Sequence, residues 1–415
     1  MSQTTSPTEE PKTGWRSLPH NVWAVSLTSF FMDISSEMVI NLLPLFLANV
    51  LGVRISLIGL IEGIAEATSS LLKVFSGWFS DRVGERKWLA VAGYGISTLA
   101  KPFFYVAQTW GQVLAVRWAD RVGKGIRTAP RDALVADSID EKQRGLAFGL
   151  HRAADSGGAM VGLLIALGVI WAAQEASVKL GRDTFQTVVL ISLIPAVLAV
   201  LVLAFGARDV PVSGERARPK ITLRGLGKPF LIFLVIVGIW DLGNSSDAFL
   251  VLRAQSLGTS VVGIMLMLIT FNFVYAVVSM PAGALSDRIG RRKIIIGGWL
   301  AYAVIYFGFA MAQTSWQAWL LYASYGLYYG MAYGTSKAMV ADLVPQELRG
   351  TAYGTYNAVL GILDLPASLI AGILWQGIAG WAGLGASAPF IFGAACSLLA
   401  AVLMLLWKPP VPQPR

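Results

Sequence analysis

Residues 77–87 read Gly77-Trp-Phe-Ser-Asp81-Arg-Val-Gly84-Glu-Arg86-Lys87, and the pattern returns 206 residues later as Gly283-Ala-Leu-Ser-Asp287-Arg-Ile-Gly290-Arg-Arg292-Lys293. A second segment, Asp137 to Gly149, returns at an offset of 205 as Asp342 to Gly354. Two similar halves in the same orientation predict parallel structural repeats.

The composition around these repeats is that of a membrane protein. The chain has 415 residues, of which 55% are hydrophobic and only 14% are charged, whereas a soluble domain carries about 25% charged residues. Because cytoplasmic loops of membrane proteins are rich in Lys and Arg, the net charge of +9 does not require nucleic acid as a partner. The single Cys396 excludes an internal disulfide, and two histidines are too few for a histidine metal cluster. We expect neither a metal nor a cofactor.

Apolar runs long enough to cross a bilayer lie on both sides of a polar break. They span about 21–51, 56–79, 88–108, 111–135, 145–172 and 185–206, then 229–253, 260–284, 293–313, 315–340, 350–380 and 387–407. We therefore predict an all-α membrane protein with 12 transmembrane helices in two pseudo-symmetric six-helix bundles. The predicted segments are an N-terminal tail (1–20), a bundle (21–207), a linker (208–228), a second bundle (229–407) and a C-terminal tail (408–415).

The distribution of basic residues predicts the orientation. The linker and the loops after the second and eighth runs are rich in Lys and Arg, and the loops on the other side are poor in them. Both termini should therefore lie in the cytoplasm, and the protein should cross the cell inner membrane many times. The polar start of the chain and the lack of a small-residue cleavage site indicate no signal peptide.

The doubled loop G-x-x-x-D-R-x-G-x-R-K resembles the signature of the major facilitator superfamily, and the resemblance covers about 21 to 407. It implies a transporter in which the loop Asp and Arg residues latch helix ends on the cytoplasmic side and release them during alternating access. By resemblance this gating role falls on Asp81, Arg82, Arg86, Asp287, Arg288 and Arg292. Gly77 and Gly283 would let helices approach closely.

The fourth run carries a basic stripe along one helical face. At about 100° per residue its polar members fall within an arc of roughly 120°. They are Arg117, Asp120, Arg121, Lys124, Arg127, Thr128 and Arg131. Since each intramembrane cation costs about 2.5–3.5 kcal/mol, the stripe must face an aqueous path or a set of anions. Arg121-x-x-x-Gly125 resembles the superfamily's fourth-helix motif, whose Arg is linked to proton coupling. The alternative is a structural ion-pair network.

Carboxylates for such a role lie on neighbouring runs. Asp33 and Glu37 share a face of the first helix, and Asp155 follows His151 and Arg152 on the fifth. A buried carboxylate beside an Arg can gain or lose its proton as its surroundings change. We take Asp33, Glu37 and Asp155 as candidate proton carriers, and a static salt bridge is an equal alternative for each. Glu62 on the second helix favours the static role. Residues 149–158 resemble the fifth-helix antiporter signature, with Ala in place of its Gly-Pro pair.

The second half is aromatic where the first is basic. Tyrosines on the tenth helix offer stacking and hydroxyl hydrogen bonds to an organic solute. Asp241 and Asn244 share one face of the predicted seventh helix, and Asn357 and Asp364 share one face of the eleventh. The candidate substrate-binding residues are Arg117, Arg121, Lys124, Arg152, Tyr325, Tyr329, Lys337, Asn357, Asp241 and Asn244.

These observations favour a proton-coupled secondary transporter that exports a small, anionic organic solute as a monomer in the lipid bilayer. Two alternatives stay open: a multidrug/proton antiporter for amphipathic cations, and uptake of an organic anion by proton symport. An enzyme is disfavoured, because no nucleophile elbow, P-loop or metal constellation occurs. A non-transporting receptor is disfavoured, because no soluble domain is appended.

Overall fold

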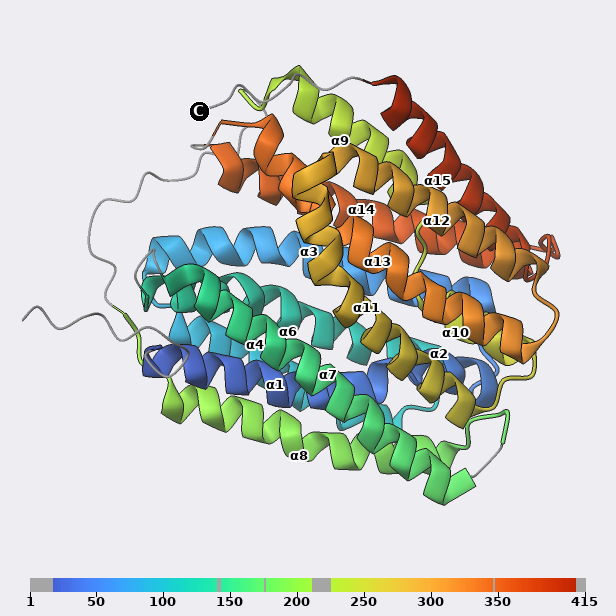
Figure 1. The fold of residues 1–415 in the computed structure, drawn as a ribbon. Coiled ribbons are helices and arrows are strands. Elements are labelled where there is room, and N and C mark those ends of the chain that lie inside the picture. Colours follow the sequence, from blue (N-terminus) through green and yellow to red (C-terminus); the bar gives the residue numbers. More distant parts are fainter. Residues whose placement is uncertain (1–17, 140–142, 175–176, 211–224, 346–347, 408–415) are drawn as a thin grey trace, which may run out of the picture.

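The computed structural model describes residues 18–139, 143–174, 177–210, 225–345 and 348–407, and the regular structure in these ranges is helical throughout. The first half forms α1 (His20–Ile40), α2 (Leu43–Leu45), a π-helical turn (Phe46–Val50), α3 (Ile55–Val83), α4 (Lys87–Ala100), α5 (Phe103–Val106), α6 (Trp110–Asp137), α7 (Arg144–Gln174) and α8 (Arg182–Gly206). The second half forms α9 (Gly227–Leu242), α10 (Ala248–Ser256), α11 (Val261–Ile289), α12 (Arg291–Met311), α13 (Ser315–Leu343), α14 (Arg349–Gln376) and α15 (Ala388–Leu406). Every predicted apolar run coincides with one or more of these helices (Figure 1). The predicted tails and most of the predicted linker lie outside the described residues.

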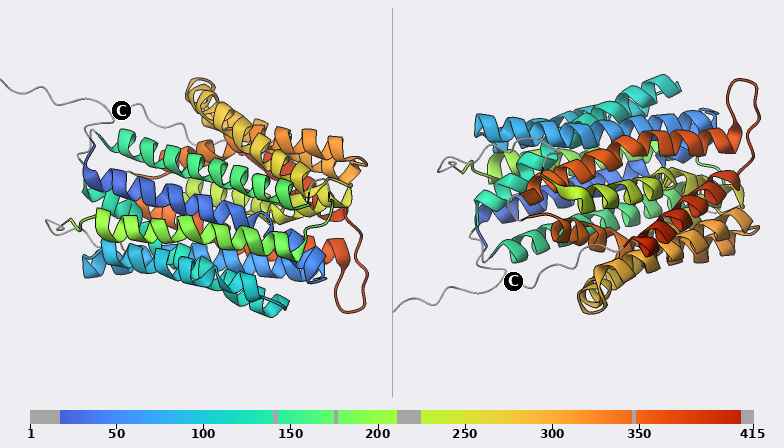
Figure 2. Two further views of the ribbon diagram at one scale, coloured as in Figure 1. Left: turned by 90° about the horizontal axis from the view of Figure 1, so that it is seen from below. Right: turned by 90° about the horizontal axis from the view of Figure 1, so that it is seen from above.

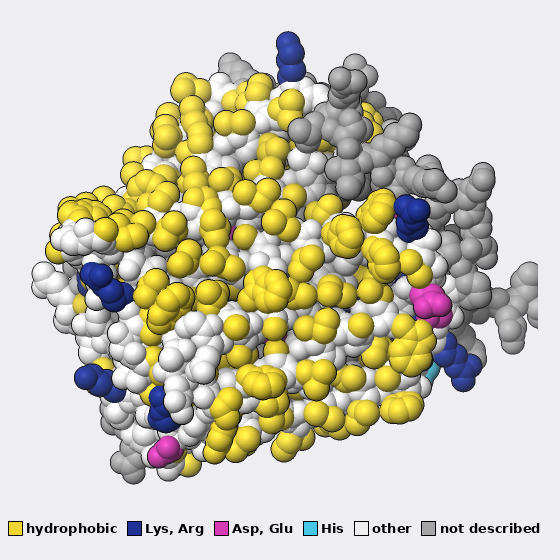
Figure 3. All heavy atoms as spheres, turned by 180° about the vertical axis from the view of Figure 1, so that it is seen from behind, with side chains coloured by type: hydrophobic (Ala, Val, Ile, Leu, Met, Phe, Trp, Pro, Cys, Tyr) yellow, Lys and Arg dark blue, Asp and Glu magenta, His cyan; other side chains and the backbone are white. Residues whose placement is uncertain are grey.

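Among the described residues, 8 helical stretches are long and apolar enough to cross a membrane. The other predicted runs do not meet this criterion of helix length and hydropathy, and the reasons are local. Lys101 and Pro102 separate α4 from the short α5, and residues 243–247 separate α9 from α10. The charged stripe lowers the hydropathy of α6, and tyrosines and glycines lower that of α13. Figure 3 shows one face of the molecule with apolar side chains over its middle and Lys and Arg at its two ends, the pattern of a bilayer belt.

The two halves repeat the same helix packing. In the first half α1 packs on α7 and α8, and α6 packs on α3 and α4. The corresponding pairs of the second half are α9 with α14 and α15, and α13 with α11 and α12. The equivalence of these pairs agrees with the internal sequence repeat, because the same helix order buries the same faces in each half.

Two symmetric helix pairs join the halves, α3 with α14 and α7 with α11 (Figures 1 and 2). We name the two ends of the molecule by the helices that finish there. The basic end is where α3, α6, α8, α11, α13 and α15 finish; the opposite end is where α5, α7, α10, α12 and α14 finish. The basic end lies to the left in Figure 1.

The halves meet closely at the opposite end. A Cβ atom on Gly59 of α3 would lie 2.3 Å from the carbonyl oxygen of Ser368 on α14, so only glycine permits this crossing. The amide of Ile55 donates to Oε1 of Gln376 over 2.5 Å, and the amide of Val261 donates to the carbonyl of Ser177 over 3.0 Å. These backbone contacts close the opposite end in this conformation.

The repeated loop glycines behave differently in the two halves. A Cβ on Gly77 would lie 3.3 Å from Ala129 of α6, in agreement with the predicted close approach. A Cβ on Gly283 would meet no atom within 4 Å, so the same prediction is wrong there. On α7, Gly158 packs against α1 so tightly that a Cβ would lie 2.3 Å from the carbonyl oxygen of Phe30. The glycine of the antiporter-like segment therefore has a packing role.

Candidate functional site

The basic stripe of α6 begins in a packed ion-pair network. Arg117 is 1% exposed, and its Nη2 atom lies 2.7 Å from Oε2 of Glu62 and 3.6 Å from Oε1 of Glu66. Its Nη1 atom lies 3.8 Å from Oδ2 of Asp120. The ion pair with Glu62 agrees with a static role for that carboxylate. The guanidinium of Arg117 offers no accessible surface to a solute in this conformation, contrary to the expectation that it lines the transport path.

One turn further along α6, Arg121 lies at the boundary between the core and the accessible interior. Its own side chain is buried, and its Nη2 atom lies 3.1 Å from Oε1 of Glu66. The Glu66 side chain keeps 35% of its surface exposed. A solute that reaches Glu66 therefore also reaches the edge of the Arg121 pair.

Lys124 is the member of the stripe that is left for a solute. It is partly exposed, and its ammonium group has no hydrogen-bond or ion-pair partner among the described residues. Arg127, by contrast, donates to Oγ of Ser97 over 2.6 Å, and Arg131 pairs with Asp132 at 2.9 Å. A structural network therefore engages most of the predicted stripe, and Lys124 remains as an open cation.

The candidate proton carriers on α1 differ in their partners. Glu37 accepts a hydrogen bond of 2.8 Å from the side chain of Asn41, one turn along the same helix. Asp33 is partly exposed and has no hydrogen-bond or ion-pair partner in the described part of the chain. Its charge lies within electrostatic range of Asp155 and Lys124. Of the two carboxylates, Glu37 is thus engaged by a side-chain hydrogen bond and Asp33 is not, among the residues described.

On α7, Oδ2 of Asp155 lies 3.8 Å from Nε2 of His151. Both ring nitrogens of His151 and Oδ1 of Asp155 are buried without a hydrogen-bond partner in the described structure. Arg152 points instead to the second half, where its Nη2 atom donates to the hydroxyl of Tyr275 on α11 over 3.0 Å. The three residues therefore share a helix but not one site.

The tyrosines of α13 form a continuous aromatic wall. Tyr325 is fully buried and donates to Oδ1 of Asp247 over 3.1 Å, while the partly exposed Tyr329 packs edge-on against it at 5.2 Å between ring centroids. Tyr333 continues the wall toward the basic end, and the Lys337 ammonium lies 4.6 Å from its ring centroid. Tyr329 and Lys337 present accessible surface to the interior. Tyr325 is buried, and it hydrogen-bonds to Asp247, which is partly exposed.

The remaining predicted contacts of the second half are spread over two helices. Asp241 is 3% exposed, and its Oδ2 atom has no hydrogen-bond partner in the described structure. Asn244 accepts a hydrogen bond of 3.3 Å from the hydroxyl of Tyr302. Asn357 on α14 is exposed. Asp241 lies in the core rather than on an accessible wall, so a direct contact with a solute is not available to it here.

Two residues of the predicted latch of the first half, Asp81 and Arg86, take part in an ion-pair network at the basic end, and their gating role stays a prediction. Arg86 is nearly fully buried; its Nη2 atom lies 3.1 Å from Asp81 and its Nε atom 2.5 Å from Asp137 at the end of α6. The amides of Arg86 and Lys87 both donate to Oδ1 of Asp209. Arg82 is exposed and lies over the ring of Trp78 at 5.6 Å, outside this network.

The second half builds its latch from a different residue. Arg291, not Arg292, pairs with Asp342 at 3.0 Å. Arg292 donates to the carbonyl oxygens of Met404 and Leu405 at the end of α15, at 2.9 Å and 2.6 Å. Arg288 is exposed, and the side chain of Asp287 lies outside the described atoms. The repeat therefore predicted a basic contact at this loop, but here Arg291 and not Arg292 pairs with Asp342, and the gating role of these residues stays a prediction.

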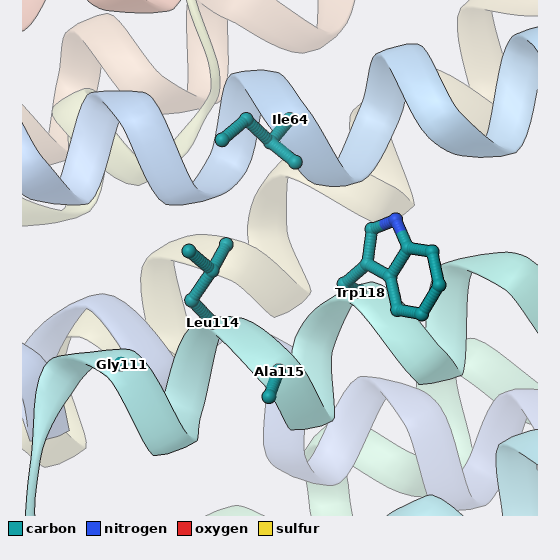
Figure 4. A pocket seen from close by; sticks show the side chains of 5 residues that line it. All are labelled: Ile64, Gly111, Leu114, Ala115 and Trp118. Atoms are coloured by element: carbon teal, nitrogen blue, oxygen red, sulfur yellow. The ribbon is translucent and has the colours of Figure 1, made fainter.

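A hollow of about 300 Å³ lies between α3 and α6, lined by Ile64, Gly111, Leu114, Ala115 and Trp118 (Figure 4). Its lining is apolar, and Trp118 is half-exposed. These residues occupy the face of α6 that turns away from the basic stripe. The hollow therefore suits an acyl chain of the bilayer better than a polar solute.

Three interior residues were missing from the predicted site: Lys73 on α3, Asp247 before α10 and Tyr275 on α11. Lys73 is partly exposed without a hydrogen-bond or ion-pair partner for its ammonium group within the described ranges. An isolated cation or carboxylate inside an apolar run was a usable signal for the first two. Tyr275 could not be distinguished by sequence from an ordinary packing aromatic.

Comparison with known proteins gives a consistent result. The family model of the Major Facilitator Superfamily matches residues 25–252 and 230–415. An uncharacterised MFS-type transporter of Methanocaldococcus jannaschii is 34% identical over 396 residues, which cover 94% of this chain and 95% of that protein. The fosmidomycin resistance protein of Escherichia coli is 24% identical over 349 residues, with 75% and 82% covered. Among solved structures, a variant of the nucleoside transporter NupG has a TM-score of 0.76 at 12% identity, covering 94% of this chain and 100% of that one, which is a likeness of fold.

Proposed function

Because this chain belongs to the major facilitator superfamily, and is therefore a membrane transporter and not an enzyme, we propose that it exports a small organic anion by proton-coupled alternating access. The proposal includes twelve membrane crossings with the basic end in the cytoplasm, since basic loops are retained on that side. The observation that carries it is a set of accessible interior cations without an ion-paired carboxylate among the described residues, which includes Lys124 on α6 and Lys337 on α13 as well as Lys73 on α3.

These two ammonium groups come from different halves of the molecule. Lys337 is engaged only by the neutral Tyr333 hydroxyl, 3.4 Å away, among the described residues. An accessible cation inside a membrane protein needs a counter-ion, and no carboxylate in the described ranges forms a direct ion pair or hydrogen bond with either Lys, although Asp33 and Glu66 lie within electrostatic range of Lys124. An anionic solute bound between the halves would act as this counter-ion in one conformation and would be released in the other, as alternating access requires.

Proton coupling is proposed to run through Asp33. Its carboxylate is accessible, has no hydrogen-bonded partner among the residues described, and lies within electrostatic range of Lys124. A proton on Asp33 removes the local negative charge that competes with an anionic solute for Lys124. Proton and solute occupancy would thereby be linked through one cation.

The direction of export is supported by the antiporter-like segment of α7 and by a relative whose name is a drug resistance protein. Closure of the opposite end is the conformation in which a cytoplasmic solute would enter. There the two halves approach backbone to backbone, since a Cβ atom on Gly59 would lie 2.3 Å from the Ser368 carbonyl oxygen and one on Gly372 would lie 2.7 Å from the Cα atom of Ser56.

The test uses purified protein and reconstituted vesicles. A panel of organic anions and cations is first screened for thermal stabilisation, since a ligand that binds the folded state raises its stability. Hits are then loaded into vesicles, and release is measured with and without an imposed proton gradient. We expect anions to be released in exchange for protons, and we expect Lys124→Gln to slow release at least tenfold while Lys228→Gln at the basic end does not.

Three results would contradict the proposal. Stabilisation by lipophilic cations alone would favour the multidrug alternative. Anion movement in the same direction as protons would favour symport. Equal flux in the Lys124→Gln and Lys228→Gln variants would remove the role of Lys124.

A further inference from the structure

Asp247 lies at a break in a membrane helix. Residues 243–247 between α9 and α10 are not helical, and the hydroxyl of Tyr302 donates to the freed carbonyl oxygen of Gly243 over 3.0 Å. The break turns Asp247 toward α13, where Tyr325 donates to its Oδ1 atom over 3.1 Å. Breaks of this kind in transporters place polar groups at the solute site.

The surroundings of Asp247 are aromatic and, within the described ranges, contain no paired counter-cation. The rings of Tyr306 and Tyr325 lie 6.1 Å apart, and those of Tyr325 and Tyr329 lie 5.2 Å apart. In the described part of the chain no Lys or Arg forms an ion pair with Asp247, which is nevertheless partly exposed. An ionised carboxylate without a cationic partner in such a place is costly, and the cost is relieved when it takes up a proton or meets a cation from elsewhere.

Asp247 also faces the other half of the molecule. Glu37 and Glu66 lie within its electrostatic range, and both belong to the first half. Because Arg121 already pairs with Glu66, Glu37 is the carboxylate that adds negative charge opposite Asp247, which disfavours a solute anion at this depth and favours a positive group. No group of three or more Asp, Glu, His or Cys side chains in the described residues is placed to hold a metal ion.

The opposite charge gathers further along the same aromatic wall. Tyr333 follows Tyr325 by eight residues, or about 12 Å along α13. Beside Tyr333 lies the Lys337 ammonium group, 4.6 Å from the ring centroid, and Arg152 reaches the wall through the hydroxyl of Tyr275. The wall thus has a negative pole near Tyr325 and a positive pole near Tyr333.

We infer that Asp247 and the tyrosines around it bind an ammonium group of the solute, while Lys337 and Arg152 bind its anionic group. The inference rests on the proposed function, because the solute still carries an anionic group. It narrows the substrate class to dipolar organic ions whose positive and negative groups are separated. An ammonium group gains a charge pair with Asp247 and cation–π contacts with the tyrosine faces, which together suit this chemistry. The spacing along α13 places the two poles of the wall about 12 Å apart, which is the charge separation expected of the solute.

The experiment uses matched pairs of probes on the purified full chain. The dipolar probes are 4-aminobutanoate, 6-aminohexanoate and 8-aminooctanoate, and the anionic ones are butanoate, hexanoate and octanoate. Affinities are measured by calorimetry and thermal stabilisation. We expect at least one amino acid of the series to bind about tenfold more tightly than its amine-free partner, because it gains the contact with Asp247.

Variants assign the difference to its residue. Asp247→Asn should abolish the preference for the amine, Asp247→Glu should keep it, and Lys337→Gln should weaken the members of each pair alike. Asp183→Asn, at the exposed start of α8, is the matched control and should change nothing. Melting temperatures show that each variant is folded, and Tyr325→Phe provides a milder perturbation of the same carboxylate.

The outcomes separate this inference from the proposed function. If amino and amine-free acids bind equally, or if Asp247→Asn keeps the preference, the inference fails while anion transport stands. If Asp247→Asn binds every probe normally but loses proton-driven flux, Asp247 is a proton carrier and the inference fails. If no organic anion binds at all, the proposed function fails as well.

Discussion

Arg86 and Asp137 form a buried ion pair of 2.5 Å at the basic end, whereas the repeat-related Arg292 and Asp342 do not pair with each other. The first pair ties the loop after α3 to the end of α6. In the second half Arg291 takes over this contact, and Arg292 covers the end of α15. The two ion pairs occupy equivalent positions, but the first should contribute more to the free energy of unfolding, because its side chains are far less exposed.

Replacing Arg86 with Ala should destabilise the protein more than replacing Arg291. The change removes the buried guanidinium that contacts both Asp137 and Asp81, and loss of one member of a buried pair costs about 3–5 kcal/mol. Arg291 is more exposed, so its replacement should cost about 1 kcal/mol. The measurement is the free energy of unfolding from SDS titration in mixed micelles. Equal losses of unfolding free energy in the two variants would show that the two ion pairs contribute equally to stability.

The core of the stripe allows a second test of stability. Arg117→Ala should cost about 3–5 kcal/mol of unfolding free energy, because Glu62 then stays buried without a cation. Arg117→Ala combined with Glu62→Ala should cost less than the sum of the single changes, by about 0.5–3 kcal/mol. Arg54→Ala, at an exposed position of the opposite end, is the control. Additive losses would contradict a direct pairing of the two side chains.

The close crossing of α3 and α14 predicts a conformational effect. Gly59→Val adds side-chain atoms where a Cβ already lies 2.3 Å from the Ser368 carbonyl oxygen, so the opposite end should be unable to close. A cysteine introduced at Ser56, which is buried there, should react faster with a membrane-impermeant thiol reagent once Cys396 has been replaced by Ala. Gly95→Val is the matched control, because no described atom lies within 4 Å of its Cβ position. Unchanged labelling in Gly59→Val would show that the ends move independently of this contact.

The sequence predicted the helices well, because apolar runs and a doubled loop are strong, local signals. The packing of equivalent helix pairs followed from the repeat. The sequence could not predict which cations were already paired. Arg117 and Lys124 look alike on a helical wheel, but Glu62 from another helix reaches only the first. The roles of Arg291 and Arg292 were likewise decided by the end of α15, more than 100 residues away.

The role of Asp33 leads to a prediction about coupling. Asp33→Asn keeps the size and polarity of the side chain but removes its ability to carry a proton, so release driven by a proton gradient should fall at least tenfold. Exchange of labelled for unlabelled solute at equal pH on both sides should continue, because that reaction needs no net proton movement. Glu62→Gln is the informative comparison, since its carboxylate is engaged by Arg117 and should contribute stability rather than coupling. If Asp33→Asn retains full proton-driven release, the proton must travel through another carboxylate, with Asp155 as the next to be tested. If exchange is lost together with proton-driven release, Asp33 binds or positions the solute instead of carrying the proton.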